Sequence, residues 1–412
     1  MSDDLSSSAP SVRRVHVVGA GPVGLLMTAL LQKAPGYYIR LYEKRSEYTR
    51  NRMVRLAPYL VADSIDAYRS DPLDGDNVEA VFQPWELQEA LSFRQQQMSP
   101  DLRALLVDLT GGFCRLNDIE LALSDLIGQG GPSPVERITA TLDVDSIQAM
   151  LEPSDILIDC TGCKSLLRDH LVPEGEPAYG EERNTNSIRM EHAVVATFLF
   201  NKRYECNEYC KYYKNLDNSQ YKFVPSVERT LYDEGASHVT GIIRISEKEY
   251  DAMPTKCEVS WLREHMPAVA RSMERFIAKV EAETGGALEG DPQVIRIVLD
   301  LYRAYNATNR KWLRGRLTEH PFARSSVFLV GDSAIGSPYF QSISLGFECA
   351  MFLAGLLTHT EYSADEELEH YERLVYQQWL RVYMRTKQIK HNKDLFETLD
   401  DTFGLLEKLH IF

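Results

Sequence analysis

The stretch Val15-His16-Val17-Val18-Gly19-Ala20-Gly21-Pro22-Val23-Gly24 decides the fold class of this chain. Four β-type residues run into the pattern Gly-x-Gly-x-x-Gly, and an apolar segment typical of a helix follows at 25–31. In such a turn Gly19 allows the sharp bend, Gly21 leaves room for a pyrophosphate, and Gly24 lets helix and strand pack closely. The stretch predicts a dinucleotide site, with a purely structural strand–helix turn as the alternative. The site would use Gly19, Gly21, Pro22, Val23 and Gly24.

A second predicted strand at 38–42 ends in Glu43, which lies 19 residues beyond Gly24. A carboxylate at this place holds the hydroxyl groups of an adenosine ribose in dinucleotide-binding folds. The glycine pattern and Glu43 together are more specific for a dinucleotide site than the glycine pattern alone.

The composition is that of a globular protein and excludes some partners. The chain has 412 residues, 44% hydrophobic and 25% charged, with a formal net charge of −15. This charge argues against nucleic acid or an anionic membrane as a partner, and no apolar run reaches the length of a membrane span. Residues 1–12 are expected to be a disordered leader without the apolar core of a signal peptide. Seven cysteines without such a peptide favour reduced thiols and a cytoplasmic location.

The pattern along the chain predicts an α/β fold with an inserted domain. A Rossmann-like domain is expected at 13–187 and 311–360, an antiparallel-sheet substrate domain at 188–310, and C-terminal helices at 361–412. Within the insertion, strands at 192–200, 237–246 and 293–301 flank a long helical stretch near 257–283. A buried strand at 155–159 is expected to return to the first sheet.

A second strand-to-turn signal lies some 310 residues beyond the first. Residues 327–330 are apolar, Gly331-Asp332 follows them, and a helix-like segment begins near Ser344. An aspartate at a strand end suits a hydroxylated chain such as ribityl, and a helix start suits a phosphate or a flavin carbonyl. Both signals together predict one cofactor held by both parts of a split domain.

With these motifs the chain resembles the class A flavoprotein monooxygenases, which have the para-hydroxybenzoate hydroxylase fold, and most of all the MICAL monooxygenase domain. The resemblance rests on the glycine turn, Glu43-Lys44-Arg45, the segments 49–52, 56–59 and 301–307, and Gly331-Asp332. It implies that FAD lies across the first domain, with its adenosine ribose on Glu43 and the segment Arg50-Asn51-Arg52 beside the isoalloxazine.

The resemblance also implies an activity. An FAD-dependent monooxygenase would insert one oxygen atom from O2, through a flavin C4a-hydroperoxide, into a small aromatic or electron-rich molecule, with NAD(P)H as reductant. The expected pocket lies between the inserted sheet and the segment 50–52. The alternatives are a flavin-dependent dehydrogenase or oxidase without oxygen insertion, and a binding protein that carries flavin as a redox or structural element.

The basic segment after Glu43 supplies the remaining candidate residues. Five cations stand within twelve residues of an acidic chain, which favours a phosphate- and flavin-facing role over a solvated loop; they are Lys44, Arg45, Arg50, Arg52 and Arg55. Arg52 is the candidate catalytic residue, where the MICAL pattern has asparagine. The predicted cofactor residues besides the glycine turn are Glu43, Lys44, Arg45, Arg50, Asn51, Asp332, Ser344, Leu345 and Gly346.

Two departures from the family pattern bear on the chemistry. Thr161 replaces an acid linked to flavin and NADPH handling, and the glycine-rich loop after Gly-Asp is replaced by residues 340–346.

Cys160 and Cys163 have the spacing of a dithiol or a metal site, but small core cysteines are favoured and no metal site is expected. Aromatic residues crowded at 204–223 favour a packed edge, with a wall over a flat substrate as the alternative.

Overall fold

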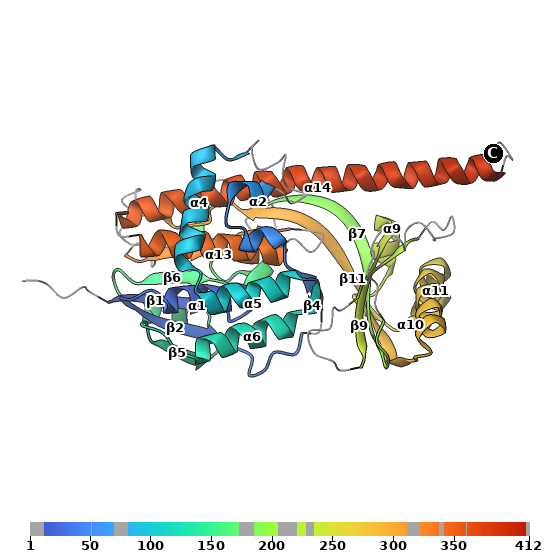
Figure 1. Cartoon of the computed structure of the whole chain (residues 1–412), viewed down its shortest axis with the longest axis horizontal. Coiled ribbons are helices and arrows are strands. Elements are labelled where there is room, and N and C mark those ends of the chain that lie inside the picture. The colour runs from blue at the N-terminus through green and yellow to red at the C-terminus, as the bar shows by residue number, and fades with distance from the viewer. Residues whose placement is uncertain are drawn as a thin grey trace, which may run out of the picture.

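The computed structural model has two lobes, one built on a parallel sheet and the other on an antiparallel sheet (Figure 1). It describes residues 12–50, 52–69, 81–172, 185–204, 221–227, 235–310, 322, 324–337, 342–359 and 361–408. The expected leader lies outside these residues, apart from its last one.

The first lobe contains a five-stranded sheet within the described residues, in the order β12-β6-β1-β2-β5. Every neighbouring pair is parallel. The bounds are β1 (Arg13–Val18), β2 (Tyr37–Glu43), β5 (Val135–Thr139), β6 (Ile156–Asp159) and β12 (Ser326–Leu329). The predicted strands near 155–159 and 327–330 are thus confirmed as neighbours in this sheet. All five carboxyl ends lie at one edge, which is where ligands bind in sheets of this kind.

Helices cover the parallel sheet because their apolar residues face it. In α1 (Pro22–Gln32), Leu25, Leu26 and Leu30 are fully buried, and each such side chain contributes about 1.5–3 kcal/mol of burial free energy. Helix α1 packs between α6 (Leu116–Gly128) and α13 (Ser342–Thr358). Further helices are α2 (Ile65–Arg69), α4 (Pro84–Gln97), α5 (Pro100–Thr110) and α7 (Val144–Met150). A short antiparallel pair, β3 (Met53–Arg55) and β4 (Phe113–Arg115), faces the second lobe.

The second lobe is an antiparallel sheet in the order β10-β11-β7-β9-β8. Its strands are β7 (Thr185–Phe200), β8 (Phe223–Val227), β9 (Ser237–Ile245), β10 (Lys256–Cys257) and β11 (Leu288–Ala304), and β13 (Ile335–Gly336) pairs with β11. The helices α10 (Val259–His265) and α11 (Pro267–Thr284) cover its outer face (Figure 1). A small helix, α9 (Glu247–Ala252), follows β9.

The predicted single helix near 257–283 is wrong, because it is two helices. Met266 has an extended φ of −135° and a ψ of 60°, and Pro267 begins the next helix. Proline has no N–H for the preceding turn and disfavours the helical conformation of the residue before it.

Two long strands join the lobes. Met190 of β7 and Leu301 of β11 belong to the core of the first lobe, whereas Val194 and Val294 of the same strands belong to the core under α10 and α11. Their pairing runs from Leu288 opposite Phe200 to Ala304 opposite Thr185. The lobes are therefore connected by a continuous piece of hydrogen-bonded sheet.

The C-terminal part is one long helix, α14 (Ala364–Lys408), rather than several. Ser363 and Glu366 form a capping box at its start. An apolar stripe of the helix packs on the first lobe, with Leu368, Tyr371, Val375 and Val382 buried. The helix runs along the first lobe and extends beyond it over the second (Figure 1).

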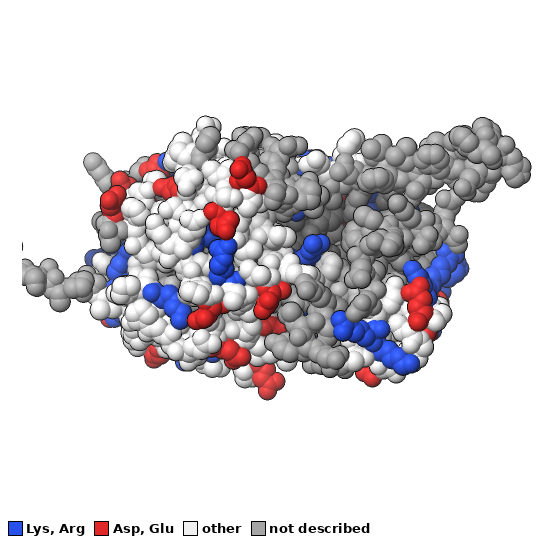
Figure 2. Space-filling model, in the orientation of Figure 1, with Lys and Arg blue, Asp and Glu red and all other residues white. Residues whose placement is uncertain are grey.

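Among the described helices, none is sufficiently long and apolar to cross a membrane. On the face shown in Figure 2, basic and acidic side chains alternate over the parallel-sheet lobe.

Candidate functional site

The glycine turn after β1 has the geometry that its sequence predicts. Gly19 has a φ of +97°, a conformation that favours glycine. A Cβ on Gly24 would lie 1.9 Å from the Gly19 carbonyl oxygen, so the close approach of strand and helix requires glycine there. At Gly21 the nearest atoms to an added Cβ are Arg50 Nη2 at 3.4 Å and Glu120 Oε1 at 4.0 Å. Gly21 is thus the open side of the turn. No side chain caps the start of α1, where Pro22 is the first residue.

Glu43 lies at the end of β2, directly beside this turn. Its carboxylate accepts hydrogen bonds from Ala20 N at 3.0 Å and from Arg45 N and Nε at 3.0 and 2.9 Å. Burial opposes its ionisation, but the hydrogen bonds and charge of Arg45 and the bond from Ala20 outweigh burial and lower the pKa of Glu43. The group is a fixed, ionised acceptor at the edge of the sheet, with 14% of its side chain exposed. Lys44, next to it, is exposed.

The structure adds a residue that sequence reasoning missed. Glu120 on α6 is fully buried and accepts a hydrogen bond from Arg50, and Arg45 Nη2 lies 3.7 Å from the same oxygen. Two of the five cations expected to face phosphate and flavin are thus paired with carboxylates, Arg45 with Glu43 and Arg50 with Glu120. No local signal identifies Glu120, since an acid on a helix is usually solvated.

Arg52 and Asp332 come from the two distant motifs and act on each other. Removal of hydration by the surrounding protein lowers the pKa of the Arg52 guanidinium, with Asp332 opposing and Arg50 adding to the shift, although the side chain is exposed. Burial raises the pKa of Asp332, while Ser342, Arg52, Arg168 and Arg50 oppose that rise.

Two side chains that sequence reasoning did not select, Arg168 and Tyr302, bind the backbone carbonyl groups of the Gly331-Asp332 turn. Arg168 is buried and donates to the carbonyl oxygens of Ser333 and Asp332, both at 2.9 Å. The Tyr302 hydroxyl donates to the same Asp332 oxygen at 2.7 Å, and the Arg168 guanidinium lies over the Tyr302 ring at 5.2 Å. The turn is thereby fixed to both β11 and the segment after β6.

The start of α13 joins the two halves of the site. Ser342 donates to the Asp332 carboxylate, and Ser344 Oγ accepts from Ala57 N at 2.9 Å. A Cβ on Gly346 would lie 2.7 Å from Val23 Cγ2, so this helix packs on the glycine turn through glycine. Leu345 is 2% exposed and packs in the core, which leaves only its backbone for a ligand. Asn51 lies outside the described residues, as do 340 and 341 of the segment that replaces the glycine-rich loop.

Thr161 stabilises the turn after β6 through hydrogen bonds to Asp159. Its N and Oγ1 donate to Asp159 Oδ1 at 2.8 and 2.6 Å. Cys160 is buried as predicted, and burial raises the pKa of its thiol well above the ordinary value. The prediction of a core position is wrong for Cys163, which is exposed because it lies in the short 3₁₀ turn Gly162–Lys164. Cys206 and Cys210 lie outside the described residues.

The inner face of the antiparallel sheet faces the basic segment. Thr240 Oγ1 accepts from Met53 N at 3.3 Å, and His238 Nε2 lies 3.4 Å from Arg115 Nη1. Strand alternation puts Ile242 on the same face. Its cross-strand neighbours there are Val195 and Val224, and Ile295 stands opposite Val195. This apolar wall is defined by Val195, Val224, Ile242 and Ile295.

The aromatic residues near 204–223 belong to the other face. Tyr204 and Phe223 pack against Phe276 of α11, and Tyr221 donates a hydrogen bond to Glu249. These three side chains form a packed edge, as the sequence favoured. Tyr209, Tyr212 and Tyr213 lie outside the described residues.

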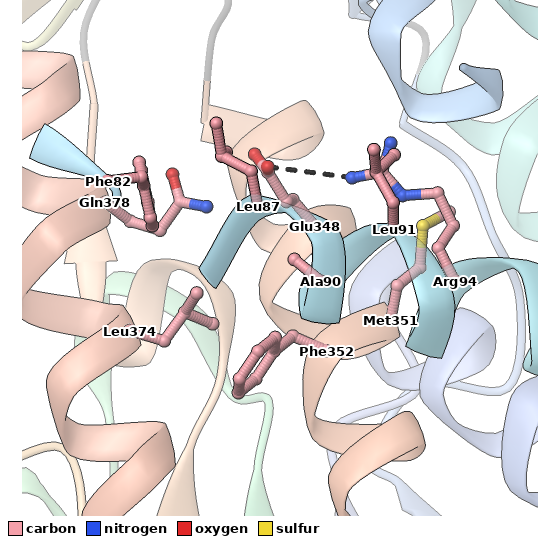
Figure 3. A pocket seen from close by; sticks show the side chains of 10 residues that line it. All are labelled: Phe82, Leu87, Ala90, Leu91, Arg94, Glu348, Met351, Phe352, Leu374 and Gln378. Carbon is pink, nitrogen blue, oxygen red and sulfur yellow. Dashed lines mark ion pairs between the residues drawn. The ribbon is translucent and has the colours of Figure 1, made fainter. Parts of the chain in front are cut away.

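A cavity between α4, α13 and α14 lies elsewhere (Figure 3). Apolar side chains and Arg94, Glu348 and Gln378 line it, and none of the predicted site residues does. Glu348 holds both Nη atoms of Arg381, at 3.1 and 2.6 Å, and lies 3.6 Å from Arg94. These contacts attach α14 to the first lobe.

The residues at the sheet edge fit a dinucleotide. They comprise an open glycine at an uncapped helix start, an ionised acceptor at the end of β2, and a carboxylate from the second motif. Helix starts of this kind bind phosphate.

No protein family model and no curated protein matches this chain. Two solved structures share its fold with a TM-score of 0.50 and 12% sequence identity. One is tetracycline destructase Tet(51), where the match covers 97% of this chain and 98% of the other. The other is CtdE, in complex with FAD and substrate 4, with 92% and 88% covered. HpxO of Klebsiella pneumoniae, with FAD and uric acid, is 16% identical with a TM-score of 0.48, and 97% and 94% are covered. The architecture shared with these two structures is a Rossmann-like domain with an antiparallel sheet inserted in it.

Proposed function

We propose that this protein is an enzyme, an FAD-dependent monooxygenase acting on a small organic molecule. The observation that carries the proposal is the convergence of two distant segments on one sheet edge. The glycine turn and Glu43 come from the first segment, and Asp332 comes from the second. One extended cofactor would touch both ends, with Gly19, Gly21 and Gly24 at its pyrophosphate and Glu43 at its ribose. Reduced flavin supplies the activation of O2 when it is bound.

The chain's own residues would orient this chemistry. Arg52 is exposed and within electrostatic range of Asp332, so it would lie where negative charge develops on a reduced flavin. A fixed cation at such a place stabilises that charge most where water is scarce. Arg168 and Tyr302 would hold Asp332 in position.

The substrate would lie between Arg52 and the apolar wall. Val224, Ile242 and Ile295 of that wall are partly exposed toward the first lobe, and seams between lobes are common places for small-molecule pockets. An apolar face opposite one cation suits a flat, electron-rich molecule better than a highly charged one.

The proposed reductant and the resemblance to one family in particular rest on the sequence motifs. NAD(P)H is the proposed reductant, and the special resemblance to the MICAL monooxygenase domain depends on the motifs quoted above. Members of the resembled class couple flavin reduction to substrate binding, so we expect reduction by NADPH to be slow until substrate binds. Thr161 stands where the family has an acid, and its hydroxyl donates to Asp159. Stopped-flow bleaching of the flavin with and without substrate tests this, and no bleaching in either case would indicate another reductant or the oxidase alternative.

The first test is cofactor binding. The purified protein should be yellow and bind one FAD non-covalently, and Glu43→Ala should weaken FAD binding about 10- to 100-fold, because hydrogen bonds to a charged group contribute about 1.5–3 kcal/mol. Titration of flavin fluorescence measures the affinity. Glu136→Ala is the matched control, since this carboxylate pairs with Arg40 away from the turn. A protein that ignores FAD would overturn the proposal.

The second test separates cofactor binding from turnover. Arg52→Ala should keep its FAD content and lose turnover on the order of 100-fold, the cost of removing one fixed charge-stabilising group. Arg263→Ala is the control, because Arg263 is an exposed residue of α10 that pairs with Glu274. Lost FAD with unchanged turnover per flavin would make Arg52 a cofactor anchor instead. Product without an added oxygen atom, measured with ¹⁸O2, would favour the dehydrogenase or oxidase alternative.

A further inference from the structure

Glu120 is an acidic group in the place where a dinucleotide should bring its own negative charge. The side chain is fully buried, and its Oε1 would lie 4.0 Å from a Cβ on Gly21. A pyrophosphate uses the open side of such a glycine. A bound phosphate oxygen would therefore come close to the Glu120 carboxylate.

The charges around Glu120 balance before any ligand arrives. Two guanidinium groups, Arg50 and Arg45, face it from the segment after β2, and the Glu43 carboxylate acts on it from the end of that strand. Tyr48 is the other titratable group in range, and it lies under the Arg45 guanidinium. Two carboxylates thus face two cations. A pyrophosphate would add two negative charges and compete with Glu120 for Arg50, which can bind either group in a bidentate manner.

The site has a place for one proton. Glu120 Oε2 and Asn117 Oδ1 are buried and have no hydrogen-bond partner among the described residues. They stand three residues apart on α6, where side chains are neighbours on one face. A protonated Glu120 would be a donor, and an amide oxygen accepts such a bond. An ionised Glu120 could instead accept from the Asn117 amide nitrogen after the amide turns over.

We propose that Glu120 takes up one proton from solvent when the pyrophosphate of FAD occupies the Gly21 turn. The inference rests on the proposed function, because it needs FAD at this turn. In the free protein Arg50 neutralises Glu120. In the complex Arg50 turns to the phosphate, and the buried carboxylate becomes a neutral carboxyl. Burial already raises the pKa of Glu120 despite Arg50 and Arg45, and nearby negative charge raises a carboxyl pKa further.

Isothermal titration of FAD into the cofactor-free full-length protein tests the proposal. At one pH, titrations in buffers of different ionisation enthalpy give the number of protons taken up per FAD. The wild type should take up close to one proton. Its FAD affinity should fall up to tenfold per pH unit where the free protein has Glu120 ionised and the complex has it protonated. Glu120→Gln keeps the shape but cannot titrate, so its uptake should be zero and its affinity independent of pH.

The matched control is Glu367→Gln. Glu367 is also a buried carboxylate with a raised pKa, but it pairs with Arg13 away from the turn, so this variant should keep the proton uptake of the wild type. If Glu120→Gln fails to fold, the wild-type count still tests the proposal, because an absence of proton uptake would overturn it.

The outcomes separate the two proposals. FAD binding by the wild type without proton uptake would overturn the role of Glu120 and leave the proposed function intact. Uptake that persists in Glu120→Gln would assign the proton to another group, such as Asp332, and would also overturn it. Failure of the wild type to bind FAD would overturn the proposed function and this inference with it.

Discussion

At the scale of single residues, the glycine turn after β1 forms because its glycines have no Cβ. Gly19 and Gly24 meet through a backbone contact that leaves no room for a Cβ. Glu120 shows the opposite situation, in which a residue of ordinary helical type becomes important only through the groups placed around it.

We predict that Gly24→Ala will disrupt the turn, whereas Gly128→Ala will be tolerated. The added Cβ at position 24 would lie 1.9 Å from Gly19 O, while that at position 128 meets nothing within 4 Å. Overpacking of this kind costs about 1–3 kcal/mol or more. Alanine at the end of α6 should be neutral or stabilise by up to about 1 kcal/mol. Chemical unfolding and FAD titration of both variants measure this, and equal stability of the two would contradict it.

At the scale of elements, α14 is attached to the first lobe by a buried charge cluster. Arg381 is fully buried, holds Glu348 with both Nη atoms, and lies over the Tyr59 ring at 5.3 Å. Glu372 on the same helix accepts from the N–H groups of Ala307 and Thr308. The helix is thus attached both to α13, which follows the Gly331-Asp332 turn, and to residues 307 and 308, which follow β11.

We predict that Glu348→Ala lowers the free energy of unfolding by about 3–5 kcal/mol, because it leaves the buried Arg381 without its carboxylate. Glu274→Ala is the comparison, since its pair with Arg263 is exposed and should contribute at most about 1 kcal/mol. Denaturant midpoints measure both. A loss at Glu348 no larger than that at Glu274 would mean that α14 is held by its apolar stripe alone.

At the scale of the whole molecule, the buried histidine of β1 links folding to pH. His16 is fully buried, with Nε2 3.1 Å from Asp155 Oδ2 and Nδ1 3.1 Å from the Tyr42 hydroxyl. Neutral His16 satisfies both, donating to Asp155 and accepting from Tyr42. Burial lowers the pKa of His16, although Asp155 opposes this.

We predict that this histidine stabilises the fold above its unfolded pKa of about 6.5 and that the contribution is lost as pH falls through the lower folded value, because the unfolded chain binds the proton first. Between pH 7.5 and 5, the wild type should therefore lose more stability than His16→Gln. His265→Gln, at an exposed histidine, should follow the wild type. Parallel pH curves for all three proteins would contradict the prediction.

Much of the fold could be read from the sequence, because its signals are local. The glycine turn, Glu43 at the end of β2, the returning strand β6 and the capping box before α14 depend on neighbours in the chain. Backbone sterics and short-range hydrogen bonds act within a few residues. The break at Met266–Pro267 was also a local signal, and proline chemistry explains why one helix became two.

Which charged side chains surround the glycine turn and the Gly331-Asp332 turn was decided only by the tertiary structure. Sequence alone predicted five cations facing phosphate and flavin. Folding also brings Glu120 from α6 into contact with Arg50 and Arg45, and Arg168 into contact with the Gly331-Asp332 turn. Electrostatic interactions and burial depend on distance in space, and chain position does not reveal it. The sequence therefore determined where a dinucleotide-type turn would form, and the packing of distant segments determined which charges surround it.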